Sequence, residues 1–317
     1  MPSAQKELIV LAIGGNSLIA DKQHQTVDDQ YKACLETCTH IAQLLKQGYR
    51  IVVTHGNGPQ VGFILRRAEL ARNELHMVPL DSCGADTQGA IGYQLQKAMY
   101  NCMKDWPQRI PVATVVTQVL VDANDPAFDK PSKPIGTFMD QATAKERREK
   151  NGWSIVEDAG RGFRRVVASP EPKEILELDA IRQLVAGGFL VVAVGGGGIP
   201  VVNGPDGMLT GADAVIDKDL ASGLLANKLD ADILMVSTTV ERVCLNFGKP
   251  DQKALDQITV AEARRYITEG HFAPGSMLPK IEAVVEFLEN GGRMAIITNP
   301  PNLARAVAGE TGTRIVL

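Results

Sequence analysis

Residues 7–17 read ELIVLAIGGNS, an almost wholly apolar run that gives way at once to a glycine-rich loop. The same change recurs at HGNGP, residues 55–59, and at GGGG, residues 195–198, each of which follows a short apolar run. Runs without polar alternation are typical of parallel strands covered by helices on both faces. The sequence therefore predicts buried strands whose glycine loops lie at the carboxyl end of a mainly parallel sheet, where such sheets bind ligands.

Strands and helices are expected to alternate along most of the chain. We expect a helix over 26–47, with Thr26 as its N-cap and Gly48 just beyond its end. Further strands are expected at 50–54, 112–121, 189–194, 233–237 and 293–298. Further helices are expected at about 59–72, 84–104, 174–187, 217–228, 259–269 and 279–290. The order of elements predicts an α/β fold.

One segment interrupts this alternation. Residues 122–138 (DANDPAFDKPSKPIGTF) are rich in proline and turn residues, and a charged helix (KERREK) and a strand–turn–strand pattern over 152–167 follow. Insertions of this length are usually functional or disordered. We interpret the segment as a subdomain that projects from the sheet, the alternative being a loop without function. Arg161, Arg164 and Arg165 in it either bind phosphate or form salt bridges within the insert.

Composition excludes several classes of protein. The chain has 317 residues and a net charge of −4, which gives no electrostatic reason to expect nucleic acid or an acidic membrane as a partner. Its five cysteines form no CxxC pair, so a reducing compartment is expected rather than a disulfide framework. The N-terminus reads as a first strand and not as a signal peptide. The longest apolar stretch, 187–202, is interrupted by glycines and a proline, so a soluble, cytoplasmic protein without membrane spans is expected.

The three glycine loops favour a phosphorylated ligand. Glycines let backbone N–H groups approach an anion closely, and successive amides form anion-binding concavities. Pro59 would lie in the first turn of the helix after the second loop, directing the positive end of that helix at the same place. No GxxxxGK[ST], no GxGxxG opening a helix and no HRD or DFG element is present. A Walker-A protein, a dinucleotide-binding Rossmann domain and a protein kinase are thereby disfavoured.

Three lysines are candidates for contact with that ligand. Lys280 follows Pro279 at the start of an expected helix, where a cation opposes the helix dipole, so an anion is expected opposite it. Lys218 lies between two acids in VIDKD and is either a ligand contact or a solvated surface residue. Lys133, in the insert, is more easily explained as solvated. The five histidines share no metal-ligand spacing, and Cys34 and Cys38 read as core thiols on one helical face.

Taken together, these strings resemble carbamate kinase, a family of the amino-acid kinase superfamily. The resemblance runs in order through nearly the whole chain, and HGNGPQVG, VIDKD and GSMLPK are its most specific parts. The matching strings are Ile13–Asn16, His55–Gly62, Glu157–Gly162, Ala168–Pro170, Gly195–Pro200, Ala214–Asp219 and Gly275–Lys280.

The resemblance implies a three-layer α/β sandwich around one large, mainly parallel sheet, with a protruding subdomain at about 122–167. It implies that residues 1–205, subdomain included, bind carbamate or carbamoyl phosphate, and that residues 206–317 bind the nucleotide. It further implies a homodimer, ATP/ADP and Mg²⁺ as cofactors, and a role in arginine metabolism.

The resemblance also assigns roles to residues. Lys133 would reach into the site from the subdomain, Lys218 and Lys280 would contact the transferred phosphoryl group, and Asp219 would orient the lysines. Backbone amides would bind the acyl substrate at Gly14, Gly15, Asn16, Gly56, Asn57 and Gly58. The nucleotide would be bound by Gly196, Gly197, Asp213, Lys218, Met277 and Lys280. No carboxylate cluster identifies a metal site in the sequence.

This assignment agrees with the chemistry of phosphoryl transfer, which needs positioning and charge compensation but little covalent work. Carbamate is already an anion and needs no general base. Two other functions stay open: a binder of nucleotide or carbamoyl phosphate that has lost turnover, and a kinase of another small acid, including close analogues of carbamate. The stretch 237–244 departs from the family pattern, which commonly has an acid near Thr239 and a tyrosine near Cys244, so base affinity is expected to differ.

Overall fold

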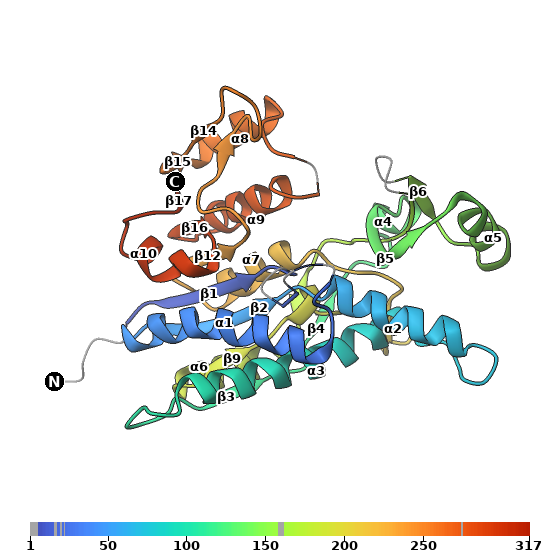
Figure 1. The fold of residues 1–317 in the computed structure, drawn as a ribbon, viewed down its shortest axis with the longest axis horizontal. Helices are drawn as coiled ribbons and strands as arrows, with labels where there is room; N and C mark the ends of the chain where they lie inside the picture. Colours follow the sequence, from blue (N-terminus) through green and yellow to red (C-terminus); the bar gives the residue numbers. More distant parts are fainter. Residues whose placement is uncertain (1–5, 16–17, 20, 22, 158–161, 274) are drawn as a thin grey trace.

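The computed structural model describes residues 6–15, 18–19, 21, 23–157, 162–273 and 275–317. Among these residues the largest element is an eight-stranded sheet, parallel throughout except between its strands β16 and β17 (Figure 1). In spatial order its strands are β15 (Gln257–Thr259), β17 (Thr313–Val316), β16 (Met294–Thr298), β12 (Ile233–Ser237), β1 (Leu8–Ile13), β2 (Arg50–His55), β9 (Leu190–Val192) and β3 (Val112–Thr114). The large, mainly parallel sheet expected from the sequence is confirmed.

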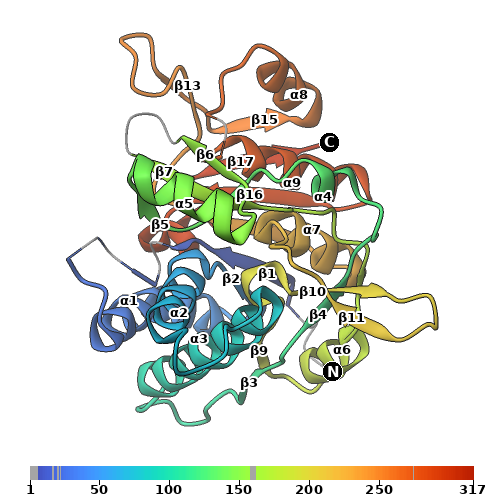
Figure 2. The same ribbon diagram turned by 90° about the vertical axis from the view of Figure 1, so that its right-hand side faces the viewer.

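Strand β1 shows why the sheet needs a layer on each face. All six of its residues are buried, and alternate side chains from Leu8 to Ala12 enter one apolar core while those from Ile9 to Ile13 enter another. The first core is closed by α6 (Leu178–Ala186), α7 (Lys218–Lys228), α8 (Val260–Thr268) and α9 (Leu278–Glu289). The second is closed by α1 (Val27–Lys46), α3 (Leu80–Cys102) and α10 (Leu303–Val307). The three-layer sandwich is thereby confirmed, with α7 and α9 on one side of β1 and α1 and α3 on the other (Figure 2).

Helix α1 forms as its sequence predicts. The Thr26 hydroxyl accepts a hydrogen bond from the Asp29 backbone N–H at 3.2 Å, and the Asp29 carboxylate accepts one from the Thr26 N–H at 3.3 Å. This reciprocal capping box satisfies two backbone donors at the helix start. Gly48, with φ of +89°, follows the last helical residue, Lys46, and reverses the chain into β2.

The single strand expected at 112–121 is wrong. The segment forms two short strands in different sheets: β3 pairs with β9 in the large sheet, and β4 (Gln118–Leu120) pairs with β10 (Ile199–Asn203). Thr117 fixes the break, because its hydroxyl donates to the Val115 carbonyl at 2.7 Å and accepts from the Val194 N–H at 3.0 Å. These bonds bend the backbone and satisfy polar groups that the interrupted sheet leaves unpaired.

The insert folds as a separate unit that projects from the sandwich (Figure 1). Its antiparallel sheet consists of β5 (Lys133–Met139), β7 (Phe163–Val167) and β6 (Ile155–Glu157), and it carries α4 (Pro126–Asp129) and α5 (Gln141–Asn151). Strand β5, which the proline-rich pattern does not predict, packs on α2 (Gly58–Ala71). A Cβ on Gly62 would lie 3.3 Å from the Cα of Gly136, so only small residues allow this approach. The projecting subdomain is confirmed.

Smaller elements complete the molecule. A four-stranded sheet contains β11 (Leu209–Gly211), β10, β4 and β8 (Glu174–Ile175), and a hairpin is formed by β13 (Cys244–Leu245) and β14 (Lys253–Ala254). Two 3₁₀ turns follow strands of the large sheet: η2 (Gly195–Gly197) and η3 (Pro300–Asn302). Within the described ranges, every helix is too short or too polar to cross a bilayer.

Candidate active site

The site is organised by the first turn of α7. Asp217 is the N-cap of this helix, and its Oδ1 accepts a hydrogen bond from the Asp219 N–H at 2.8 Å. The cap directs the Lys218 and Asp219 side chains inward, and Asp219 is only 3% exposed. An Asp at the N-cap and another in the first turn both stabilise a helix, because their negative charge interacts favourably with the positive end of the helix dipole. The VIDKD string therefore forms a stable helix start that carries a buried carboxylate and a lysine.

Three lysines from separate elements meet at this helix start. Lys218 Nζ is hydrogen-bonded to Asp219 Oδ1, and Lys280 Nζ, from the first turn of α9, lies 3.0 Å from Asp219 Oδ2. Lys133 Nζ, from the first residue of β5, lies 2.5 Å from Asp217 Oδ2. The side chain of Lys218 is 14% exposed and that of Lys280 is 16% exposed, so the interpretation of Lys218 as a solvated surface residue is wrong. Three ammonium groups against two carboxylates leave a net positive charge.

The charges at this cluster are set by burial and by each other. Burial alone would raise the pKa of the Asp219 carboxyl, but the positive charges of Lys218 and Lys280 outweigh it and lower that pKa to about 2. Burial lowers the pKa of Lys218, and Lys280 lowers it further, although Asp219 opposes both effects. Asp219 is therefore ionised at neutral pH and holds two ammonium groups close together at positions suited to an anion.

A cavity of about 570 Å³ opens beside the lysines, at the carboxyl ends of β1, β12 and β16. This is the edge at which a mainly parallel sheet binds ligands. Its lining includes Lys218, Lys280 and the glycines that follow β1. The full lining is Gly14, Gly15, Ala33, Glu36, Thr37, Lys218, Ser237, Thr238, Thr239, Gly275, Ser276, Lys280, Asn299, Pro300 and Pro301. The volume lies within the range of small-molecule sites.

The first two glycine loops lie at the cluster. Gly14 and Gly15 line the cavity, and a Cβ on Gly14 would lie 3.2 Å from the Ser237 carbonyl oxygen of the neighbouring strand end. A Cβ on Gly56 would lie 3.4 Å from the Cδ of Lys218, so this glycine lets the loop pack on the lysine stem. Asn16 lies outside the described residues.

Asn57 and Gly58 form the start of α2. Asn57 makes no side-chain cap, and its Nδ2 instead donates to the Thr87 hydroxyl of α3 at 2.9 Å. Its side chain is buried and ties two helices together, so any contact with a ligand would come from the backbone. Gly58 is the first helical residue, and a Cβ there would meet no atom within 4 Å, which leaves the amides at this end accessible.

The third glycine loop is packed under the second. A Cβ on Gly196 would lie 2.1 Å from the Asn57 Nδ2, and a Cβ on Gly197 would lie 2.5 Å from the Ile216 carbonyl oxygen. Both glycines are buried, have positive φ, and lie outside the cavity lining. Close packing therefore explains why glycine stands here. Their contact with a nucleotide stays a prediction.

Two other predicted nucleotide contacts also lie outside the cavity lining. The Asp213 carboxylate, 70% exposed, lies 3.4 Å from an Nη of Arg165 in the subdomain. Met277 is the N-cap residue of α9 and packs against the first apolar core, which α7 and α9 help to close. Its neighbours Ser276 and Lys280 reach the cavity. Among the nucleotide contacts implied by the resemblance, the structure brings together Lys218 and Lys280.

Among the cavity residues, Ser237 and Thr238 belong to the stretch 237–244 that the resemblance ties to base affinity, whereas Asn299, Pro300, Glu36 and Thr37 were not anticipated from the sequence. Ser237 is the last residue of β12 and Thr238 follows it, and Asn299 and Pro300 follow β16 as Gly14 follows β1. The rule that ligands bind at the carboxyl ends of parallel strands would have identified them, since both strands were expected. Glu36 and Thr37 lie in the middle of α1 and had no such signal.

His55 is the one histidine in a predicted ligand loop, and the structure makes it part of the core. It is 1% exposed, its Nδ1 lies 3.1 Å from the Gly56 carbonyl oxygen, and a Cβ on Gly195 would lie 2.3 Å from its Nε2. Burial lowers the pKa of His55 to about 4, with Lys218 contributing in the same direction and the Gly56 carbonyl opposing. His55 is thus neutral at physiological pH and supports the loops.

Within the residues that the structure describes, no group of three or more His, Cys, Asp and Glu side chains could hold a metal ion. Glu36 lines the cavity, and Asp217 and Asp219 at the start of α7 are engaged by lysines.

Proteins of known family share this fold. The amino acid kinase family model matches residues 7–299. The chain is 53% identical over 314 residues to carbamate kinase-like protein YahI of Escherichia coli, covering 98% of this chain and 99% of the relative. It is 48% identical to carbamate kinase of Clostridium perfringens, covering 97% and 99%. A structure titled carbamate kinase from Giardia lamblia bound to AMP-PNP superposes with a TM-score of 0.91 at 41% identity, covering 98% of each chain.

The chain therefore belongs to the amino acid kinase family and has the fold of a phosphate-transferring kinase. Within that family it belongs with the carbamate kinases and carbamate kinase-like proteins, whose whole length it shares.

Proposed function

We propose that this protein is a carbamate kinase that catalyses reversible transfer of a phosphoryl group between ATP and carbamate, working toward ATP synthesis from carbamoyl phosphate and ADP. The observation that carries the proposal is the meeting of Lys133, Lys218 and Lys280 at Asp217 and Asp219. The acceptor is inferred from relatives at 43–48% identity that bear the name carbamate kinase.

The reaction places simple demands on these residues. In the direction of carbamoyl phosphate, a carboxylate oxygen of carbamate attacks the γ-phosphorus of ATP, the bond to the β–γ bridging oxygen breaks, and ADP leaves. Negative charge is spread over three equatorial oxygens as this happens. Lys218 and Lys280 are held by one carboxylate and would face those oxygens, so they compensate the charge without rearrangement. Because carbamate is already an anion, no group has to remove a proton.

The two substrates would approach from different sides. We assign the acyl substrate to residues 1–205, with the amides of Gly14, Gly15 and Gly56 at its phosphate and Lys133 brought in by the subdomain at 122–167. We assign the nucleotide to residues 206–317 and to the cavity beside Thr238 and Thr239. Thr239 lines that cavity and Cys244 is half-buried nearby in sequence, so the departures from the family pattern would affect base affinity.

The proposal includes Mg²⁺, bound together with the nucleotide. It would supply further charge compensation between the transferred phosphates. Since Asp217 and Asp219 are bound to lysines, we expect the ion to enter the site on the phosphates of ATP or ADP, with much of its water shell retained. We further propose that the enzyme is a cytoplasmic homodimer that serves arginine metabolism.

The test is ATP formation from ADP, Mg²⁺ and carbamoyl phosphate by the purified protein. The wild type should form ATP, Lys218→Ala should lose activity by about a thousandfold, and Lys228→Ala, at the exposed end of the same helix, should retain it. A folded protein that binds ADP but forms no ATP would instead favour a regulatory binder. ATP formation from another acyl phosphate alone would favour a kinase of a carbamate analogue.

A further inference from the structure

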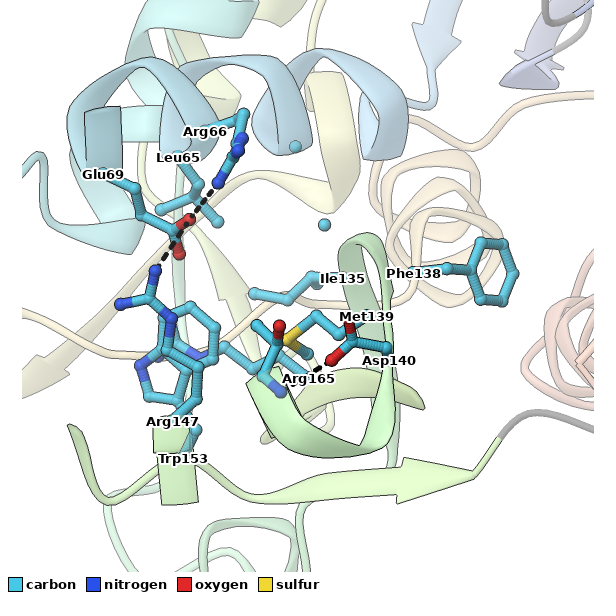
Figure 3. A pocket seen from close by; sticks show the side chains of 13 residues that line it. Leu65, Arg66, Glu69, Ile135, Phe138, Met139, Asp140, Arg147, Trp153 and Arg165 are labelled. Atoms are coloured by element: carbon cyan, nitrogen blue, oxygen red, sulfur yellow. Dashed lines mark hydrogen bonds and ion pairs between the residues drawn. The ribbon is translucent and has the colours of Figure 1, made fainter. Parts of the chain in front are cut away.

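A second pocket lies between α2 and the protruding subdomain (Figure 3). Its volume is about 270 Å³, and it shares no lining residue with the active-site cavity. It adjoins a neighbouring hollow of about 300 Å³, with which it has Leu65, Glu69, Arg147, Trp153 and Arg165 in common. None of these residues is among those assigned above to phosphoryl transfer.

Three arginines and two carboxylates, Glu69 and Asp140, line this pocket. Arg66 Nη1 lies 3.3 Å and Arg147 Nη2 lies 3.6 Å from the same oxygen of Glu69. Figure 3 shows the two guanidinium groups reaching Glu69 from opposite sides, Arg66 from α2 and Arg147 from the subdomain. Arg165 is the third cation, and its acidic partner Asp213 is 70% exposed. The pocket therefore has an excess of positive charge.

The guanidinium groups of Arg147 and Arg165 have spare donors although both are largely buried, with side chains 15% and 19% exposed. Within the described part of the chain, the oxygen contacts of Arg147 are Glu69 at 3.6 Å and Asn151 at 3.4 Å, and that of Arg165 is Asp213 at 3.4 Å. These distances exceed those of a normal N–H···O bond. An arginine offers five donors, so these few long contacts leave N–H groups of both arginines available to an additional acceptor.

Trp153 holds the two guanidinium groups in place. The Cζ of Arg147 lies 5.3 Å and that of Arg165 lies 4.9 Å from the centroid of the indole ring. Stacking on a tryptophan face restrains a guanidinium while its edge stays available for a carboxylate or phosphate. Leu65, Ile135 and Met139 give the rest of the pocket an apolar wall. Fixed cations beside an apolar wall are the features of a site for an organic anion.

We propose that this pocket binds a small organic anion, through a carboxylate or phosphate group held by Arg147 and Arg165 beside Trp153. The anion accepts hydrogen bonds from Arg147, which Glu69 contacts at 3.6 Å, and from Arg165, which Asp213 contacts at 3.4 Å. Because α5 and β7 carry these arginines and β5 carries Lys133, an occupied pocket fixes the subdomain against α2 and thereby fixes the position of Lys133. The proposal does not depend on which acid the active site phosphorylates.

Trp153 supplies a direct measurement. The chain has two tryptophans, so Trp106→Phe leaves Trp153 as the only one. In this background we would titrate intrinsic fluorescence with sodium phosphate and with sodium succinate, at an ionic strength kept constant with chloride. A saturable change with either anion is expected, and the anion that binds more tightly identifies the head group. Arg147→Gln and Arg165→Gln should each weaken binding about tenfold or more, whereas Lys145→Gln, exposed on the same α5, should not.

Two further variants keep the test decisive. Glu69→Gln removes the competing charge and should tighten binding by about fivefold, a gain that misfolding cannot produce. Lys218→Ala should leave the titration unchanged, which separates this pocket from anion binding in the active site. The proposal is overturned by no response to either anion, by a response that persists in both arginine variants, by a response lost in Lys218→Ala, or by a Glu69→Gln titration that is not tighter.

Discussion

Lys280 Nζ lies 3.0 Å from Asp219 Oδ2, although 61 residues separate the two in the chain. Lys280 is in the first turn of α9, where the helix dipole disfavours a cation. The buried carboxylate of Asp219, from the first turn of α7, compensates that cost and places the ammonium beside Lys218. One acid thus positions the two cations that we assign to the transferred phosphoryl group.

Replacing Asp219 should affect stability as well as activity. Asp219→Asn leaves two largely buried ammonium groups without their counter-ion, and breaking a buried pair in this way costs about 3–5 kcal/mol. We expect a lower urea midpoint and a loss of ATP formation. Asp179→Asn, at a side chain 92% exposed on α6, is the control and should change neither. An unchanged midpoint in Asp219→Asn would show that the lysines do not depend on this carboxylate.

Lys133 should serve the acyl substrate and not the nucleotide. Its side chain reaches Asp217 from the subdomain, whereas the cavity assigned to the nucleotide is lined by other elements. For Lys133→Ala we expect kcat/KM for carbamoyl phosphate to fall about a hundredfold, with ADP binding within about twofold of the wild type. Lys130→Ala, exposed in the same segment, is the matched control. Equal losses of ADP binding and turnover would contradict the division of roles.

His55 should make stability depend on pH. Its folded pKa of about 4 lies below its ordinary value of 6.5, so the folded state favours the neutral ring. The resulting stability is fully present above pH 6.5 and is lost as pH falls from 6.5 toward 4, by up to about 3 kcal/mol. Urea midpoints measured across this range should fall in the wild type and change less in His55→Gln. Parallel pH profiles would assign the loss to other groups.

Gly196 should be needed for packing. It has φ of +69°, and a Cβ there would lie 2.1 Å from the Asn57 Nδ2 that bonds to Thr87. Gly196→Ala should therefore cost about 2–4 kcal/mol through strain and overpacking. Gly207 has φ of +78° and open space around the position of a new methyl group. Gly207→Ala should therefore lower stability only by the conformational cost, about 1 kcal/mol. Equal costs, measured by urea unfolding, would refute the packing explanation.

The sequence predicts those parts of the fold that depend on neighbouring residues. The strand at 233–237 is found as expected, and α1 begins after the Thr26 cap because the capping box needs only residues within one turn. The prediction of one continuous strand at 112–121 is wrong because the break in it depends on a hydrogen bond between Thr117 and Val194, which is 77 residues away. Strand β5 was missed for a similar reason, since its pairing with β7 overrides the proline-rich composition.

The candidate site divides in the same way. The glycine loops, the acids and lysine of VIDKD and the helix-start position of Lys280 are local patterns, so the sequence by itself determined that a phosphorylated ligand was to be expected. Its resemblance to carbamate kinase added the expectation of a kinase. Only the tertiary structure decided that Lys280 and Lys218 share one carboxylate and that arginines of the subdomain line a second pocket. It also decided that Gly196 packs against Asn57 and Gly197 against Ile216, both outside the cavity lining. Distances between segments far apart in the chain are set by how the layers pack, and local sequence patterns do not predict them.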